Sequence, residues 1–261
     1  MNSSYRRAAV AGIFYPRDET ACRQRVLQLL GDSQQLTLPT INSLIVPHAG
    51  YDYSGSVAAV AYRALVATTT GQPLIAILGP NHRLPLAGMA LDSHSHFITP
   101  LGAVPLCLDT IADLQRLPGV EYNDAVHRDE HCIEVQLPFL QMLFDSFTLV
   151  PIVVGQVDAV AVSAVIGFLH SRGALVLISS DLSHFLGYEQ ACELDAATSL
   201  AIARLDIDIE PRQACGCHAI NGMNNFASSQ GWEVQQLARN NSGDSAGDKT
   251  RVVGYGAYAY C

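Results

Sequence analysis

The stretch LIVPHAGY, residues 44–51, determines the predicted fold of this chain. Its apolar residues lead directly to His48 and a glycine, which is typical of a buried strand that ends in a turn. The pattern occurs twice more, because the apolar run Leu74–Gly79 precedes His82 and Ala174–Ser180 precedes His184. Ligands of open α/β sheets bind beyond the carboxyl ends of the strands, so these histidines predict one shared site.

Segments of helical pattern alternate with the apolar runs along the rest of the chain. Examples are Glu19–Leu30 and Asp158–Ser171, each preceded by or beginning with an aspartate that can cap a helix. Such alternation predicts an α/β fold, and the hairpin-like final strands, Trp232–Ala238 and Arg251–Tyr260, make a mixed sheet the expectation. No linker divides the chain, so we predict a single three-layer α/β/α domain over residues 1–261 with a central mixed sheet.

The composition excludes several classes of protein. Hydrophobic residues make up 49% of the chain and charged residues 15%, which favours a large buried sheet. With 15 basic and 24 acidic residues, the net charge of −9 argues against nucleic-acid binding and against attraction to a membrane surface. No apolar run reaches the length of a membrane span. The seven scattered cysteines predict reduced thiols in a cytoplasmic protein.

The strand-end histidines are candidate metal ligands. Neutral imidazole binds iron, copper, zinc and nickel, and His48 and His82 are the first candidates. A third is Cys215, which precedes a predicted helix, because a helix N-terminus lowers the pKa of a thiol. The alternative is that Cys215 is a small buried residue at a turn. We do not expect the adjacent Cys217 and His218 to be ligands, since that chelate would leave the histidines without a role.

Asp181 and His184 form a second candidate pair. If both lie in the first turn of a helix, they share a face, and the carboxylate can orient the imidazole or tune its pKa towards neutrality. His184 then serves as an acid–base group beside the metal. The alternative is a capping aspartate followed by a surface histidine.

The pentamer HRDEH, residues 127–131, has the form of the inverted zinc-protease motif. That motif needs both histidines on one helix. We expect Asp129 to cap a helix that runs to Phe144 with a bend at Pro138, which leaves His127 outside and disfavours a protease. Glu130, His131 and Glu134 can still reach the pocket, or they can lie on the solvated face of that helix.

Six short segments together resemble the Memo family, called AmmeMemoRadiSam system protein B in prokaryotes. They span nearly the whole chain in order: AVAGIFYP (9–16), VPHAGY (46–51), GPNH (79–82), DEHCIE (129–134), SSDLSH (179–184) and CGCH (215–218). Memo proteins share a fold with class III (LigB-type) extradiol dioxygenases, which hold non-haem iron(II) with two histidines and a glutamate and use a further histidine as acid–base catalyst.

The resemblance implies that His48 and His82 are metal ligands and that His184 is the catalytic histidine. At the third ligand position the Memo pattern has a cysteine, which falls on Cys215. No glutamate stands there, and thiolate suits copper or zinc as well as iron. The family also implies a functional association with AMMECR1-like and radical SAM proteins.

These observations predict a metal-dependent redox enzyme that acts on an unknown small molecule or a modified side chain. Iron(II) is the favoured metal, with copper or zinc as alternatives. A non-catalytic module that binds a ligand or peptide in the same pocket is the second hypothesis, and a zinc hydrolase is the third. The predicted metal ligands are His48, His82 and Cys215, and the predicted catalytic residues are His184, Asp181 and His131.

Overall fold

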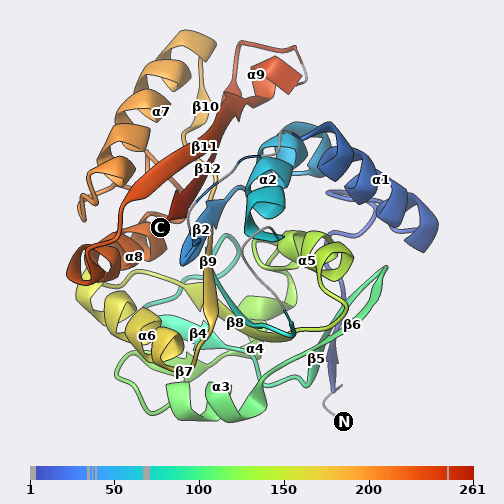
Figure 1. Cartoon of the computed structure of the whole chain (residues 1–261), viewed down its shortest axis with the longest axis vertical. Coiled ribbons are helices and arrows are strands. Elements are labelled where there is room, and N and C mark those ends of the chain that lie inside the picture. The colour runs from blue at the N-terminus through green and yellow to red at the C-terminus, as the bar shows by residue number, and fades with distance from the viewer. Residues whose placement is uncertain (1–3, 34–35, 37, 39, 67–70, 246) are drawn as a thin grey trace.

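A mixed β-sheet lies at the centre of the molecule (Figure 1). The computed structural model describes residues 4–33, 36, 38, 40–66, 71–245 and 247–261. The described strands of this sheet follow the order β10 (His184–Leu186), β12 (Val252–Tyr260), β2 (Ser43–Val46), β9 (Leu175–Ser179), β3 (Leu74–Pro80), β8 (Thr148–Val154), β4 (Met89–Leu91) and β7 (Val120–Tyr122), and β11 (Val234–Asn241) pairs with β12.

The four middle strands, β2, β9, β3 and β8, are parallel to one another. They are almost entirely buried and rich in Val, Ile and Leu, as expected for strands covered on both faces. The strands next to this block, β12 and β4, run antiparallel to it. The prediction of a mixed sheet is therefore confirmed.

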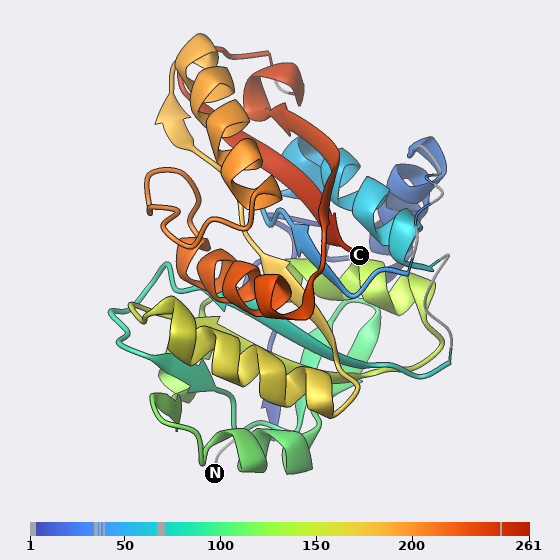
Figure 2. The ribbon, with the colours of Figure 1, turned by 60° about the vertical axis from the view of Figure 1, so that its left-hand side comes forward.

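Helices cover both faces of the sheet (Figure 2). One layer consists of α6 (Ala159–Ser171), α7 (Tyr188–Ala203) and α8 (Cys217–Gln230), and the other of α1 (Glu19–Asp32), α2 (Tyr51–Val66) and α5 (Leu137–Leu143). Asp18 caps α1 by accepting the Ala21 N–H at 2.9 Å, and Asp158 caps α6 in the same way. The predicted three-layer arrangement is thus confirmed. No described helix is long and apolar enough to cross a membrane.

Short elements complete the fold. A small second sheet has the order β1 (Tyr5–Arg6), β5 (His96–Thr99) and β6 (Gly102–Pro105). The remaining described helices are α3 (Leu108–Leu114), α4 (Asp124–Arg128), the 3₁₀ turn η1 (Glu134–Gln136) and α9 (Ser242–Ser245).

The prediction of one helix from Asp129 to Phe144 is wrong. Asn123 caps α4, Asp129 follows its last residue, and residues 129–133 have no regular helix before η1 and α5 begin. Pro138 lies at the start of α5, where its missing N–H leaves no hydrogen bond unmade. The Glu130 carboxylate accepts the N–H groups of His131 and Cys132, so it competes with helical hydrogen bonding there.

The parallel block brings its carboxyl ends to one edge. Val46 of β2 is in register with Ser179 of β9, and Leu78 of β3 is in register with Ile178 of β9. Because each strand stops within a few residues of these positions, the residues that follow meet at that edge. His48 and His82 are among them.

Candidate metal centre

His48 follows β2 and is held in one tautomer by a buried serine. Its Nδ1 lies 2.9 Å from Ser179 Oγ, and the Ser179 hydroxyl hydrogen is donated to the Cys132 carbonyl at 2.6 Å. Ser179 Oγ also accepts the Gln136 side-chain N–H at 2.8 Å, so it acts as an acceptor towards the imidazole. His48 Nδ1 therefore carries the hydrogen, and the Nε2 lone pair faces Cys215 Sγ at a hydrogen-bond distance of 3.3 Å. Burial lowers the pKa of His48, which keeps the ring neutral.

His82 follows β3 and is fixed by Glu130. One Glu130 oxygen lies 2.9 Å from His82 Nδ1, and the other accepts the His82 backbone N–H at 2.6 Å. A carboxylate bonded to Nδ1 leaves Nε2 as the ligand atom, as in many metal-binding histidines. Burial opposes ionisation of Glu130, but the adjacent imidazoles of His131 and His82 hold its pKa well below the ordinary value.

Cys215 lies two residues before α8, on a turn that faces the end of β9. Its sulfur accepts the Asp181 N–H at 3.3 Å, and the Gly216 N–H donates to Ser180 Oγ at 2.9 Å. A Cβ at Gly216 would lie 2.7 Å from the Ser180 Cβ, so only glycine fits this approach. Burial raises the pKa of the Cys215 thiol, with a further contribution from the Asp181 charge, which contradicts the predicted lowering by the helix N-terminus. A coordinated cation would reverse this balance in favour of the thiolate.

The three predicted ligands converge. Donor atoms of His48, His82 and Cys215 all lie within 4.8 Å of one another. Two imidazole nitrogens and one sulfur form a donor set that suits zinc, copper or iron. Within the described part of the chain, the groups that could hold a metal do not contain Cys217 or His218, and the prediction that neither is a ligand stays a prediction.

Asp181 and His184 differ from their predicted arrangement. Residues 181–183 form no helical turn, and His184 begins β10. The Asp181 carboxylate accepts the His48 backbone N–H at 2.8 Å, and no hydrogen bond joins it to the His184 ring in the structure as described. Asp181 is only 4% exposed, and this burial raises the pKa of its carboxyl group. Asp181 thus braces the segments that carry His48 and Cys215.

His131 packs directly on the candidate ligands. Its ring stacks on His82 at a centroid distance of 4.7 Å and meets the edge of His48 at 5.4 Å. On another side the His131 ring packs on the Phe14 ring, with the two centroids 4.7 Å apart. Its Nδ1 is buried 3.2 Å from Glu130 Oε1, in an orientation that makes no hydrogen bond. His131 therefore packs against the candidate ligands, and its catalytic role stays a prediction.

A hollow of about 440 Å³ opens beside the ligands, within the usual size range of small-molecule sites. Its lining consists of His82, His184, Leu186, Leu194, Pro211, Arg212 and Cys215. Phe185 adopts the left-handed conformation at φ 61°, where strand pairing is irregular between His184 and Leu186. A non-glycine residue in this region costs about 1–3 kcal/mol, and such strain is concentrated at functional sites.

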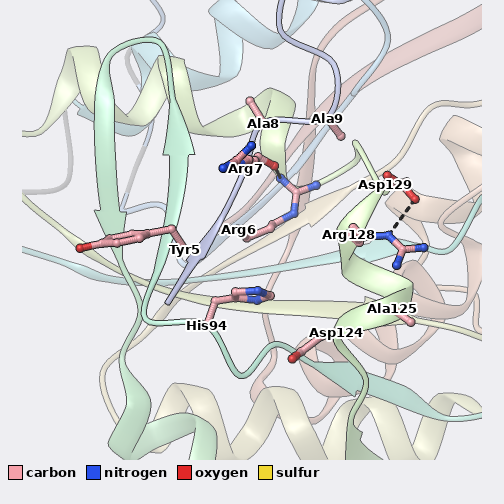
Figure 3. A pocket seen from close by; sticks show the side chains of 10 residues that line it. All are labelled: Tyr5, Arg6, Arg7, Ala8, Ala9, His94, Asp124, Ala125, Arg128 and Asp129. Atoms are coloured by element: carbon pink, nitrogen blue, oxygen red, sulfur yellow. Dashed lines mark hydrogen bonds and ion pairs between the residues drawn. The ribbon is translucent and has the colours of Figure 1, made fainter. Parts of the chain in front are cut away.

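A second hollow, of about 420 Å³, lies between β1 and α4 (Figure 3). His94 and Asp124 line it, and with Asp92 they form another group of possible metal ligands. Both Asp124 oxygens accept hydrogen bonds from Ser93, however, and one Asp92 oxygen accepts from His94 at 2.6 Å. The lining also includes three arginines, Arg6, Arg7 and Arg128, which oppose a cation.

His127 does not share a helix with His131, as the motif would need. It lies in α4, and its Nε2–H donates to the Ala90 carbonyl at 2.9 Å. No group of possible ligands among the described residues contains both His127 and His131. The HRDEH pentamer therefore does not form a zincin-type site.

The sequence did not indicate that Glu130 and Ser179 orient the candidate ligands. Glu130 stands beside His131 in a recognisable motif, but the helix predicted there gave it no defined direction. Ser179 was treated as part of a strand. A small polar residue at the buried end of an apolar strand was the available signal, because such a hydroxyl needs a partner.

Comparisons with known proteins show the family and the fold of this chain. A family model described as "Memo-like protein" matches residues 6–259. A MEMO1 family protein of Sulfolobus acidocaldarius is 35% identical over 95% of this chain and 96% of its own length. MEMO1 family protein MK0963 of Methanopyrus kandleri is 33% identical over 98% of both chains. The crystal structure of the uncharacterized protein JW3007 from Escherichia coli K12 has a TM-score of 0.55 at 11% identity, over 84% of this chain and 99% of that one, which shows a shared fold. The chain belongs to the Memo family.

Proposed function

We propose that this Memo-family protein is a metal-dependent redox enzyme that acts on a small molecule or a modified side chain. The supporting observation is the convergence of the His48, His82 and Cys215 donor atoms within 4.8 Å. Both histidine Nδ1 atoms have partners, so both Nε2 atoms remain available. The hollow beside them has the volume of a small-molecule site.

Iron(II) is our first choice of metal because the resemblance to class III extradiol dioxygenases implies it. The cysteine sulfur makes copper and zinc competing choices. A bound ion would supply Lewis acidity and, if it is iron or copper, one-electron chemistry. His48, His82 and Cys215 would hold the ion with three protein ligands, which would leave coordination positions for a bound molecule or water.

The remaining side chains are assigned acid–base and orienting roles. His184 lines the hollow together with His82 and Cys215, so its imidazole is placed to take a proton from a bound molecule or return it. His131 lies against both histidine ligands and excludes water from one side of the centre. Asp181, whose pKa is raised by burial, holds the His48 backbone and is the second candidate proton carrier.

Metal analysis of protein purified anaerobically without added ions tests this proposal. We expect iron or copper close to one ion per chain, and oxygen uptake when ascorbate is supplied as reductant. Tightly held zinc without oxygen uptake would favour a hydrolase instead. Protein that binds no metal but binds a ligand or peptide unchanged would favour a non-catalytic module.

The setting of the enzyme is part of the same proposal. The acidic net charge of −9 supports a protein that contacts neither nucleic acid nor membrane. Free thiols and a soft metal ligand are compatible with a reducing cytoplasm. Family membership supports a functional association with AMMECR1-like and radical SAM proteins.

A further inference from the structure

The N-terminal segment contacts the irregular loop beside the metal centre through one buried carboxylate. Glu134 is fully buried, and its two oxygens accept hydrogen bonds from Arg6 at 2.7 Å, from the Ala9 and Val10 N–H groups at 2.7 and 3.0 Å, and from the Tyr15 hydroxyl at 2.6 Å. All these donors lie more than a hundred residues away in sequence. Glu134 therefore fixes residues 6–15 against the start of η1.

Arg6 contacts this loop and the two helices that flank it, α4 and η1. Its Nε donates to the His127 carbonyl at 2.9 Å, one terminal nitrogen donates to the Glu130 carbonyl, and the other forms the 2.7 Å ion pair with Glu134. The guanidinium lies 4.6 Å over the Phe97 ring and is itself only 3% exposed. Figure 3 shows Arg6 beside Arg7 among the side chains that line the second hollow.

The loop of residues 129–133 carries groups that orient the metal ligands. Glu130 fixes His82, and the His131 ring packs on His82 and His48. Residues 129–133 lack regular helical structure, so their position depends on side-chain contacts. Phe14, in the segment that Glu134 holds, presses on His131 from another side.

We infer that Arg6 and Glu134 are positioning residues of the metal centre, which hold the Glu130–His131 loop so that His82 presents Nε2 to the ion. The inference rests on the metal centre of the proposed function, and it makes the N-terminal segment a functional part of that centre. Arg6 suits this role because its planar guanidinium makes three directed contacts that a lysine ammonium cannot reproduce.

The test is Co²⁺ binding to the full-length protein, followed by the visible absorption of the bound ion. The variants are Arg6→Lys, Glu134→Gln and the milder Tyr15→Phe. The matched control is Tyr260→Phe, which removes the buried 2.6 Å hydrogen bond to Asn224 at the opposite end of the strand pair β2–β12. Thermal unfolding of the metal-free proteins shows whether each variant loses as much stability as the control Tyr260→Phe does.

We expect Arg6→Lys and Glu134→Gln to weaken Co²⁺ binding by about tenfold or more, the range found when supporting contacts of metal ligands are lost. Their cobalt spectra should shift because His82 is no longer fixed. Tyr260→Phe should keep wild-type affinity and spectrum at a similar loss of melting temperature. If Glu134→Gln does not fold, Arg6→Lys and Tyr15→Phe decide the question.

Two results would overturn the inference. One is wild-type Co²⁺ affinity and spectrum in Arg6→Lys and Tyr15→Phe. The other is a loss of Co²⁺ affinity in Arg6→Lys and Glu134→Gln that is no greater than the loss in Tyr260→Phe. Either result leaves the metal centre itself intact, whereas a wild-type chain that binds no Co²⁺ overturns both this inference and the proposed function.

Discussion

Two regions of this molecule bring histidines and carboxylates together, and they differ in which atoms remain free. At the carboxyl edge of the parallel strands, Ser179 and Glu130 occupy the Nδ1 atoms of His48 and His82. Their Nε2 atoms are left for a ligand. In the second hollow, by contrast, Asp124 is already bonded to its neighbour Ser93. A metal centre therefore requires directed supporting contacts that leave donor atoms free, and residue type alone is not sufficient.

Removing a ligand should separate the two regions most strongly. Cys215→Ser and His48→Ala should lose affinity for Co²⁺ by more than the about 10–100-fold expected for a lost supporting contact. His94→Ala, in the second hollow, should bind as the wild type does. Isothermal titration with the metal-free proteins measures all three. Equal losses in His94→Ala and Cys215→Ser would show that the wrong cluster was chosen.

The supporting contact should have the next largest effect. Glu130→Gln should weaken metal binding by about 10–100-fold, because the amide holds His82 less firmly than a carboxylate does. The matched variant is Asp124→Asn in the other region, for which we expect no change. The same titration applies, and unchanged binding in Glu130→Gln would remove the role assigned to that carboxylate.

The affinity of the centre should depend on pH in a defined direction. Burial raises the pKa of Cys215, so the thiol is protonated at neutral pH, and metal binding must release that proton. Affinity should therefore rise by about tenfold per pH unit below the thiol pKa, with one proton released from Cys215. His48, whose pKa is lowered by burial, adds no proton near neutral pH. Titrations in buffers of different ionisation enthalpy count the protons, and pH-independent binding would contradict a thiolate ligand.

The smallest effect on metal binding is expected for His184→Ala. His184 lines the hollow but does not belong to the group of converging donor atoms in the described chain. Metal content should equal that of the wild type, whereas oxygen uptake should fall by about 10²–10⁴-fold, the usual contribution of an acid–base group. Loss of metal to the same extent as in His82→Ala would instead make His184 a ligand.

The sequence predicted the strands and the meeting of His48, His82 and Cys215 because those features follow from local patterns, strand topology and family resemblance. It did not predict the loop after Asp129, since Arg6, which contacts that loop at the Glu130 carbonyl, lies 124 residues away in sequence. The predicted lowering of the Cys215 pKa is also wrong, because burial raises that pKa by more than the helix N-terminus lowers it. Asp181 was placed on a helix, whereas its carboxylate bonds to His48, 133 residues earlier in the chain. Contacts of this separation leave no periodic signal in the sequence.

X-ray absorption of the loaded protein tests the central claim most directly. For protein with one equivalent of Zn²⁺, the account predicts one sulfur at about 2.3 Å and two imidazole nitrogens at about 2.0–2.1 Å, with lighter atoms completing the shell. Cys215→Ser should lose the sulfur contribution, and Cys217→Ser should keep it. A wild-type spectrum without sulfur, or one with two sulfurs, would contradict a centre built from His48, His82 and Cys215.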